Sequence, residues 1–360
     1  MEDVIKAEYD MRDQLLHVMI DNNWSDMYLT VWTTPAIKIS WEIVRIDDWV
    51  EELTAKDTLD FAKSLITEHQ LSELQTTKNL DFSFGFADRR FRCNISFQMW
   101  YYMVVLRLLW NDIPNIDLLW LTDVYKDVTK RWQWLILVTW PTGSWKTTTL
   151  SAMIDYINTN YNKHIITIED PIEYVHKHKE SIVEQKEIWR DVLDYKTALI
   201  WAMRQNPQVI FFGEMRSKQE MEMALTLAET GHLVFSTLHT RSAHQTISRI
   251  IDTFNWEDKT QIRLQLADSL VAVFSQRLLT LEDWWWVKLA KEVLVNNKAI
   301  ANLIRENDLH QIPSIIQMWQ REGMQLLETD IIEFINSWLI TKEEWYKYSN
   351  NPKYIKESIT

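Results

Sequence analysis

Alternation of apolar and polar residues in the first third of the chain predicts a mixed α/β unit. Residues 5–21 and 57–68 carry apolar side chains at helical spacing, which predicts two amphipathic helices. Runs that alternate with a period of two predict strands at residues 27–30, 36–39, 80–87, 90–97 and 103–108. Cys93 lies in one of these strand-like runs, so we expect it to be a buried structural thiol.

Beyond about residue 118 the pattern changes to apolar runs separated by helical segments. The runs cover residues 135–139, 164–168, 209–212 and 233–238. Apolar runs that alternate with helices are typical of a parallel sheet. Proline and acidic residues cluster between the two patterns, at residues 111–117, which predicts a linker. We therefore expect two domains, residues 1–112 and residues 113–360.

Each of the four apolar runs ends in polar residues suited to phosphate chemistry. The runs lead, in chain order, into residues 140–147, into Glu169, Asp170 and Glu173, into Glu214, and into His239. Ligands bind at the carboxyl ends of the strands in open parallel sheets. Because four independent runs deliver such residues to the same edge, the sequence predicts one nucleotide site there.

Residues 140–147 read Trp-Pro-Thr-Gly-Ser-Trp-Lys-Thr, a phosphate-binding loop with tryptophan at both positions where the motif requires glycine. Glycine is required because backbone N–H groups curl around the phosphates through dihedrals that a Cβ disfavours. The indole of Trp145 would also occupy the space of the β-phosphate. As written the loop is blocked, but with glycine at positions 140 and 145 it is a Walker A sequence.

Composition favours glycine at these positions. The chain has 20 tryptophans and 5 glycines, which together make about 7% of the residues, the usual share of glycine alone. Trp284, Trp285 and Trp286 stand where a glycine turn is expected, and Trp338 follows an expected helix at a C′ position. Our hypothesis is that most of these tryptophans are UGA codons of a genome that reads UGA as glycine, translated with a code that reads UGA as tryptophan.

Two alternatives to recoding stay open. The protein is truly rich in tryptophan, or glycines were deliberately replaced by tryptophan. The coding DNA separates these explanations, because UGG codons at positions 140 and 145 would exclude recoding.

With glycine restored, the loop defines a site for ATP and Mg²⁺. Lys146 would place its ammonium on the β- and γ-phosphates, and Thr147 would offer its hydroxyl to Mg²⁺. Glu214 ends an apolar strand, where a Walker B acid holds Mg²⁺ through water. The predicted nucleotide-binding residues of this segment are Trp140, Pro141, Thr142, Gly143, Ser144, Trp145, Lys146, Thr147 and Thr148.

Two acidic positions compete for the task of polarising the attacking water. Either Glu173 or the Glu169–Asp170 pair can do this with an ordinary pKa, because positioning and electrostatics dominate phosphoryl transfer. His239 is expected to hydrogen-bond the γ-phosphate and to report its loss. His176 and His178 have no acid or cysteine at metal-ligand spacing, so we expect them in a solvated loop.

Charge and hydropathy exclude several other classes of protein. The net charge of −13 argues against a nucleic-acid partner, and the single cysteine excludes a disulfide framework. No apolar stretch approaches the ~20 residues of a membrane span, and the acidic N-terminus lacks a signal-peptide core. We expect a cytoplasmic protein.

The motifs taken together resemble those of the secretion-type ATPases that drive type IV pili and type II secretion, most closely the twitching-motility retraction branch. The resemblance covers nearly the whole chain, from about Trp24 to Trp345. It rests on residues 24–29, 90–94, 140–149, 167–173 (the "Asp box"), 213–216 (Walker B), 231–239 (the "His box") and 299–306. Several tryptophans, including 24, 100, 134, 140, 145, 189 and 284–286, fall at glycine positions of that family.

The resemblance implies a fold, an assembly and roles for further residues. It implies a PAS-like N-terminal domain, a RecA-like ATPase domain with a mostly parallel sheet, and a homo-hexamer that binds nucleotide between the two domains. Arg90, Arg92 and Arg107 would approach the phosphates, Glu173 would be the catalytic acid, and Lys146, Glu214 and His239 would complete the catalytic set. The motor would power pilus retraction at the inner face of the cytoplasmic membrane, through an inner-membrane platform protein and the pilus machinery.

Two other functions stay open. If the tryptophans of the loop are real, the chain is a catalytically dead pseudo-ATPase or scaffold subunit. A related pilus-extension or type II secretion ATPase is the third possibility, although extension ATPases of this superfamily carry a four-cysteine zinc motif that this chain lacks. Tyr28 replaces the histidine and Ala301 the arginine of the family patterns. These departures leave open whether the chain is the main retraction motor or an accessory retraction subunit.

Overall fold

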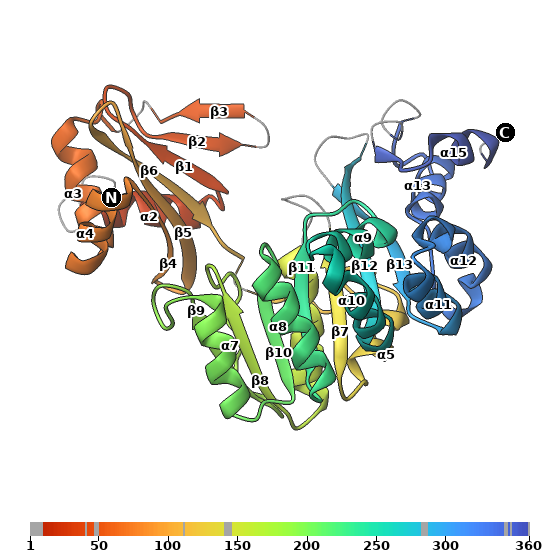
Figure 1. Ribbon diagram of the computed structural model, residues 1–360. Helices are drawn as coiled ribbons and strands as arrows, with labels where there is room; N and C mark the ends of the chain where they lie inside the picture. Colours follow the sequence, from red (N-terminus) through yellow and green to blue (C-terminus); the bar gives the residue numbers. More distant parts are fainter. Residues whose placement is uncertain are drawn as a thin grey trace. The chain divides into compact units, whose positions relative to one another are not determined.

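The computed structural model describes residues 10–39, 42–46, 50–110, 112–139, 146–281, 287–341, 345 and 348–358. The chain divides into two compact units (Figure 1). The first comprises residues 1–112 together with Asp170–Val175, and the second comprises Ile113–Glu169 and His176–Thr360. A short piece of the predicted Asp box therefore belongs to the first unit, although the strand before it belongs to the second.

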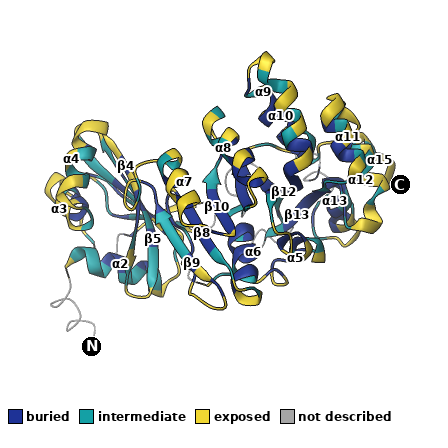
Figure 2. Cartoon of the chain, turned by 60° about the horizontal axis from the view of Figure 1, so that its bottom comes forward, coloured by how far each residue is buried: buried dark blue, intermediate teal, exposed yellow. Residues whose placement is uncertain are grey.

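The first unit is a six-stranded sheet in the order β3-β2-β1-β6-β5-β4, in which all neighbouring pairs are antiparallel. Its described elements are α2 (Met11–Asp21), β1 (Asp26–Leu29), β2 (Ala36–Ile39), β3 (Glu42–Arg45), α3 (Ala55–Leu65), α4 (Glu68–Thr77), β4 (Asn79–Phe86), β5 (Arg89–Gln98) and β6 (Tyr101–Leu108). Both α3 and α4 begin with a capping box, at Thr54 and Thr67, which fixes where each helix starts. Figure 2 colours the outward faces of these two helices as exposed.

One face of this sheet and the three helices enclose a single core. Leu15 and Leu16 of α2, Phe61 of α3 and Phe91 of β5 are all at most 2% exposed in it. Cys93 is buried and free, as predicted, and burial raises the pKa of its thiol well above the ordinary value.

The second unit is a seven-stranded sheet in the order β13-β12-β7-β11-β10-β8-β9. All neighbouring strands are parallel except β12 and β13. The strands are β7 (Trp134–Thr139), β8 (His164–Glu169), β9 (Ile182–Glu187), β10 (Val209–Glu214), β11 (Leu233–Leu238), β12 (Leu270–Thr280) and β13 (Val287–Val295). The four strands predicted from apolar runs are the adjacent central ones, and the parallel sheet expected from the sequence is confirmed.

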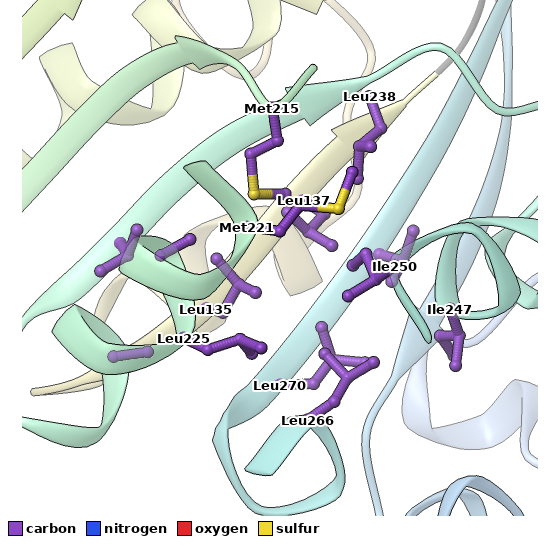
Figure 3. Packing of buried hydrophobic residues seen from close by; sticks show 14 of the residues in the cluster. Leu135, Leu137, Met215, Met221, Leu225, Leu238, Ile247, Ile250, Leu266 and Leu270 are labelled. Carbon is purple, nitrogen blue, oxygen red and sulfur yellow. The ribbon is translucent and has the colours of Figure 1, made fainter. Parts of the chain in front are cut away.

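Helices cover both faces of this sheet. They are α5 (Asp123–Thr129), α6 (Lys146–Asn160), α7 (Tyr195–Arg204), α8 (Lys218–Glu229), α9 (Ala243–Asp252), α10 (Trp256–Ser269), α11 (Lys298–Glu306) and α12 (Ile312–Met318). Alternate residues of β7 divide between two cores: Leu135 and Leu137 pack with α8 (Figure 3), whereas Ile136 and Val138 pack with α5 and α6. Because the central strands are buried on both faces, their sequences are continuous apolar runs.

The C-terminal part of the chain packs on the β12–β13 hairpin. Two 3₁₀ turns (Leu309–Gln311 and Gln320–Glu322) precede α13 (Leu327–Asn336), and α15 (Pro352–Ser358) follows it. Leu279 and Ala290 of the hairpin, with Ile331 and Ile355 of these helices, form a separate small core. Among the described residues, no helix has the length and apolar character needed to cross a membrane.

Six tryptophans in the described part of the chain adopt backbone dihedrals that favour glycine. Their φ angles lie between 52° and 95°, and they are Trp32, Trp100, Trp120, Trp134, Trp189 and Trp338. A bulky L-residue in this region is a conformational outlier that costs roughly 1–2 kcal/mol. Trp24, which also matches a family glycine, does not have this conformation.

Two of these tryptophans lie in turns of known type. Met99 (φ 49°) and Trp100 (φ 74°) connect β5 to β6, as the two central residues of a type I′ turn do, a turn that favours glycine. Trp338 lies at C′ of α13, where the N–H of Leu339 bonds the carbonyl of Phe334 in a Schellman motif. The predicted C′ position of Trp338 is confirmed. The predicted turn at Trp284–Trp286 lies outside the described residues.

The expectation of a solvated loop at His176 is wrong. The side chain of His176 is buried, and burial lowers its pKa from 6.5 to about 4. The backbone N–H of His176 donates to Oε1 of Gln185 on β9, and Nδ1 of His178 accepts the backbone N–H of Val183. Both histidines therefore support the edge strand β9.

Candidate functional site

The predicted catalytic residues of the second unit lie at one edge of its sheet. Strands β7, β11, β10 and β8 are adjacent and parallel, so their carboxyl ends meet at that edge. Thr139 at the end of β7 pairs with Leu238, which precedes His239, and Thr237 pairs with Glu214. A register shift between Phe211 and Glu214 marks a bulge at the end of β10, a device that re-aims side chains.

Lys146, His239 and Glu214 form a continuous chain of polar contacts. Nζ of Lys146 lies 3.0 Å from Nδ1 of His239, and Nε2 of His239 lies 3.0 Å from Oε1 of Glu214. An ammonium only donates hydrogen bonds, so Nδ1 accepts. Nε2 then carries the proton and donates it to the carboxylate. The geometry therefore assigns a neutral imidazole protonated at Nε2.

Glu214 has a second partner. Nε of Arg216 donates to Oε2 of Glu214 at 2.9 Å, so the two carboxylate oxygens face different groups. The backbone N–H of Arg216 donates in turn to Glu220, in the first turn of α8. Sequence reasoning did not assign a role to Arg216, although it lies in the Walker B segment only two residues after the acid.

Tyr195 contacts the same strand end from α7. Its hydroxyl oxygen lies 2.8 Å from the position that a Cβ at Gly213 would occupy, and the carbonyl of Ile168 lies 3.8 Å from that position. The phenol therefore fills the space between the ends of β8 and β10. No pattern in the sequence connects Tyr195 with Gly213, because the contact depends on how α7 packs on the sheet.

The phosphate-loop residues divide into two groups. Lys146, Thr147 and Thr148 form the first turn of α6 and are partly exposed. The others, Trp140, Pro141, Thr142, Gly143, Ser144 and Trp145, lie outside the described residues. A helix N-terminus that carries a lysine fits a phosphate group, because its N–H groups and dipole favour negative charge.

The two acidic candidates of the Asp box differ in their surroundings. Glu169 is buried and accepts hydrogen bonds from the hydroxyl of Thr167 at 2.7 Å and the amide of Gln185 at 3.2 Å. Glu173 is partly exposed and belongs to the first unit. The two carboxylates therefore belong to different units of the chain.

The three predicted phosphate-binding arginines all have partners within the first unit. Arg90 donates to the hydroxyl of Ser83 and, at 3.3 Å, to the carbonyl of Ile172 in the Asp box.

The other two arginines pair with aspartates. Arg107 pairs with Asp26 at 2.7 Å and Arg92 with Asp81 at 2.5 Å. The hydrogen bond to Asp81 raises the pKa of Arg92, and the charge of Glu173 contributes. The structure thus groups Glu173 with Arg90 and Arg92 in one unit.

A magnesium ion fits the residues at the sheet edge only as part of a nucleotide complex. Within the described ranges, no group of three or more histidine, cysteine or acidic side chains could hold a metal ion alone. Magnesium in nucleotide sites takes one or two protein ligands, with phosphate oxygens and water completing the octahedron. The hydroxyl of Thr147 and the carboxylate of Glu214 are of this kind.

Comparison with known proteins gives consistent matches over most of the chain. The model of the family described as "Type II/IV secretion system protein" matches residues 77–311. A twitching motility protein of Neisseria gonorrhoeae is 38% identical over 319 residues, which is 88% of this chain and 85% of the relative. The type IV pilus retraction ATPase PilT of Pseudomonas aeruginosa is 38% identical over 333 residues, or 92% of this chain and 95% of the relative.

A solved structure agrees with these relatives. It is the crystal structure of the pilus retraction motor PilT with bound ADP, which is 41% identical in sequence. The superposition has a TM-score of 0.90 and covers 97% of this chain and 100% of that one.

Proposed function

The chain belongs to the type II/IV secretion system protein family, and from that premise we propose that its sheet-edge residues hydrolyse ATP to power retraction of a type IV pilus. The fold class and the retraction-ATPase family expected from the sequence are confirmed by the likeness to PilT. ATP hydrolysis as the reaction class agrees with the same relatives.

One observation carries the proposed site. The chain of contacts from Lys146 through His239 to Glu214 joins three strand-end motifs that the sequence singles out separately. A purely structural role would not require an ammonium, an imidazole and a carboxylate in a single row at the carboxyl edge of a parallel sheet. Ligands of open parallel sheets bind at such an edge.

The residues then have separable roles. Lys146 stabilises negative charge on the β- and γ-phosphates, and His239 aligns both Lys146 and Glu214. Glu173 orients the attacking water, as the resemblance of residues 167–173 to the Asp box implies. Magnesium, held by Thr147 and through water by Glu214, would supply a positive charge to the phosphate oxygens.

Activity requires glycine at positions 140 and 145. Six other tryptophans have glycine-type φ angles in the described chain, and this supports the reading of UGA as glycine. We use the term glycine-containing protein for the chain translated with glycine at every in-frame UGA codon. The chain with tryptophan at these two positions would not bind ATP productively, since the indoles fill phosphate space.

The assembly and location are also proposals. We propose a PAS-like domain (residues 1–112), which makes up most of the first unit, and a RecA-like domain (residues 113–360), which contains the second unit and the segment Asp170–Val175. Six copies would form a ring, with Arg90, Arg92 and Arg107 serving the nucleotide. The PilT structure with bound ADP supports nucleotide binding by this fold. The ring would act on an inner-membrane platform protein from the inner face of the membrane.

The codon check and ATPase measurements test this function. We expect UGA at positions 140 and 145, ATP hydrolysis by the glycine-containing protein, and loss of turnover by orders of magnitude in Lys146→Ala and Glu173→Gln. UGG codons with no hydrolysis would instead support a pseudo-ATPase or scaffold subunit. If Glu173→Gln hydrolysed ATP at the normal rate while Glu169→Gln was inactive, Glu169 and not Glu173 would be the catalytic acid of the Asp box.

A further inference from the structure

Residues 239–242 connect β11 to α9, and we call residues 239–243, which include the first residue of the helix, the histidine turn. His239 is the first of them, and Ala243 is the first residue of α9. The N–H of Ala243 donates to Oε1 of Glu292 on β13 at 2.6 Å. Both residues are buried, so water does not compete for this hydrogen bond.

Glu292 supplies a hydrogen-bond acceptor for the first N–H of α9, which has no acceptor within the helix. The hydroxyl of Ser242, the N-cap residue, accepts the N–H of Gln245 at 3.4 Å and therefore serves a different donor. A carboxyl oxygen at the first N–H also suits the positive end of the helix dipole. The carboxyl of Glu292 thus fixes the end of the histidine turn against the sheet.

The C-terminal segment holds the same turn independently. The side-chain amide of Asn350 donates to the carbonyl of Arg241 at 3.3 Å. Glu328 of α13 fixes this segment, because its Oε1 accepts the N–H groups of Asn350 at 2.9 Å and Asn351 at 2.8 Å. Strand β13 and the C-terminal segment therefore each hold one residue of the turn by a hydrogen bond, at Ala243 and at Arg241.

We propose that Glu292 is a positioning residue for His239, assisted by Asn350. Three residues separate His239 from Ala243, so a shift of α9 would change the distances from the imidazole to Lys146 and Glu214. Strand β13 also leads directly into α11, which begins at Lys298. The contact therefore links the helix that resembles the retraction signature to the catalytic histidine. This inference rests on the proposed ATPase function.

The test compares variants in the glycine-containing protein. Glu292→Met removes the acceptor, whereas Glu292→Gln keeps an acceptor oxygen without the charge. We expect kcat to fall about ten- to a hundredfold in Glu292→Met, with KM for ATP changed less than about threefold, and Glu292→Gln to recover most of kcat. Hydrogen exchange at the amide of Ala243 should accelerate in Glu292→Met and stay slow in Glu292→Gln.

Asp330→Asn is the matched control. Asp330 is a buried acid of α13 that pairs with Lys291, the neighbour of Glu292, and its described hydrogen bonds go to Lys291 and Gln325. We expect it to lower thermal stability without the fall in kcat. If Glu292→Met does not fold, Asn350→Ala tests the same role, because it removes the hydrogen bond to the carbonyl of Arg241. We expect a smaller fall in kcat for this variant.

The outcomes separate this inference from the proposed function. Unchanged kcat in both Glu292→Met and Asn350→Ala, or equal loss in Glu292→Gln and Glu292→Met, would overturn the positioning role. A parent protein without ATPase activity would overturn the proposed function. In that case the exchange of the Ala243 amide would still report whether Glu292 holds the turn.

Discussion

The ammonium of Lys146 lies 3.0 Å from Nδ1 of His239, at the edge of the sheet where the phosphate loop ends. This contact fixes the direction of the hydrogen bonds, since a lysine ammonium cannot accept one. The opposite ring nitrogen then donates to Glu214 at 3.0 Å. His239 therefore bridges the ammonium of Lys146 and the carboxylate of Glu214.

We predict that His239→Ala lowers kcat of the glycine-containing protein by about two orders of magnitude, with a smaller effect on KM for ATP. Loss of the imidazole removes the group that links Lys146 to Glu214, so both groups lose their alignment. Steady-state ATPase kinetics measure this effect.

His232→Ala provides the control for that prediction. His232 precedes β11 at the opposite end of the strand from His239 and bonds the carbonyl of Leu227. It should reduce stability without a comparable loss of kcat. If the two variants lost kcat equally, the effect would belong to the strand and not to the imidazole at its carboxyl end.

The contact between Tyr195 and Gly213 gives a second prediction. A Cβ at position 213 would lie 2.8 Å from the hydroxyl oxygen of Tyr195 but 3.7 Å from Cζ. Gly213→Ala should therefore displace the neighbouring Glu214 and lower both stability and kcat. Because the backbone of Gly213 is outside the left-handed region, the effect is steric only.

Removal of the hydroxyl should relieve that clash. We expect the double variant Gly213→Ala/Tyr195→Phe to recover most of what Gly213→Ala loses, so the two changes are non-additive. Thermal unfolding and ATPase assays of the four proteins in this cycle measure the coupling. Additive effects would show that the phenol does not limit the space at position 213.

The burial of each strand determines whether the sequence predicts it. The runs at residues 135–139, 164–168, 209–212 and 233–238 were predicted because strands covered on both faces are apolar throughout. Strand β3 was missed since all four of its residues are exposed. Edge strand β9 reads Ile-Val-Glu-Gln-Lys-Glu, so its pattern breaks after two residues.

The site was predictable only in part, for related reasons. Strand ends place His239 and Glu214 at one edge, and the sequence indicates those ends. Their contact with Lys146 depends on side-chain rotamers, which no spacing encodes. One of the hydrogen bonds to Glu169 comes from Gln185 of β9, a strand that the sequence pattern did not reveal.

Tryptophan-to-glycine replacements should have opposite effects at two exposed positions. Trp100 is 93% exposed with φ 74°, and Trp201 is 53% exposed inside helix α7. Trp100→Gly should stabilise the protein by about 1 kcal/mol, since glycine adopts positive φ without strain. Trp201→Gly should destabilise it by about 0.5 kcal/mol, because glycine is a poor helix former. Denaturant unfolding measures both; equal signs would contradict the dihedral argument.

Burial of Glu292 predicts a dependence of stability on pH. The pKa of its carboxyl is raised from 4.5 to about 7; burial is the main cause, the N–H of Ala243 opposes the rise, and the charge of Glu328 adds to it. The folded state therefore binds the proton more tightly than the unfolded state. The stabilisation is complete below pH 4.5 and is lost as the pH rises to about 7.

Glu292→Gln should abolish this contribution. Between pH 5 and pH 8 the parent should lose about 3 kcal/mol of unfolding free energy relative to the variant. Urea unfolding at a series of pH values measures the difference. Parallel curves for the two proteins would mean that Glu292 titrates alike in the folded and unfolded states.

Helix α11 gives the last prediction, which concerns coupling of hydrolysis to movement. Ile300, Ala301 and Ile304 are buried and anchor the helix, in agreement with its apolar spacing. On the outer face Asn302 bonds Glu306, and Arg305 pairs with Asp268 of α10. Exposed pairs of this kind contribute less than about 1 kcal/mol to stability, so a folding role alone does not require them.

We therefore expect Asn302→Ala/Arg305→Ala to retain ATPase activity within about twofold but to lose pilus retraction. Asp268→Asn is the matched control, because it breaks the ion pair and leaves Arg305 in place. ATPase assays of the purified proteins and twitching assays of cells that carry each variant measure the two effects separately. Retention of twitching by the double variant would show that α11 is an ordinary helix with a solvated face and has no role in coupling. Loss of twitching in Asp268→Asn as well would place the effect in the α10–α11 contact and not in the exposed arginine.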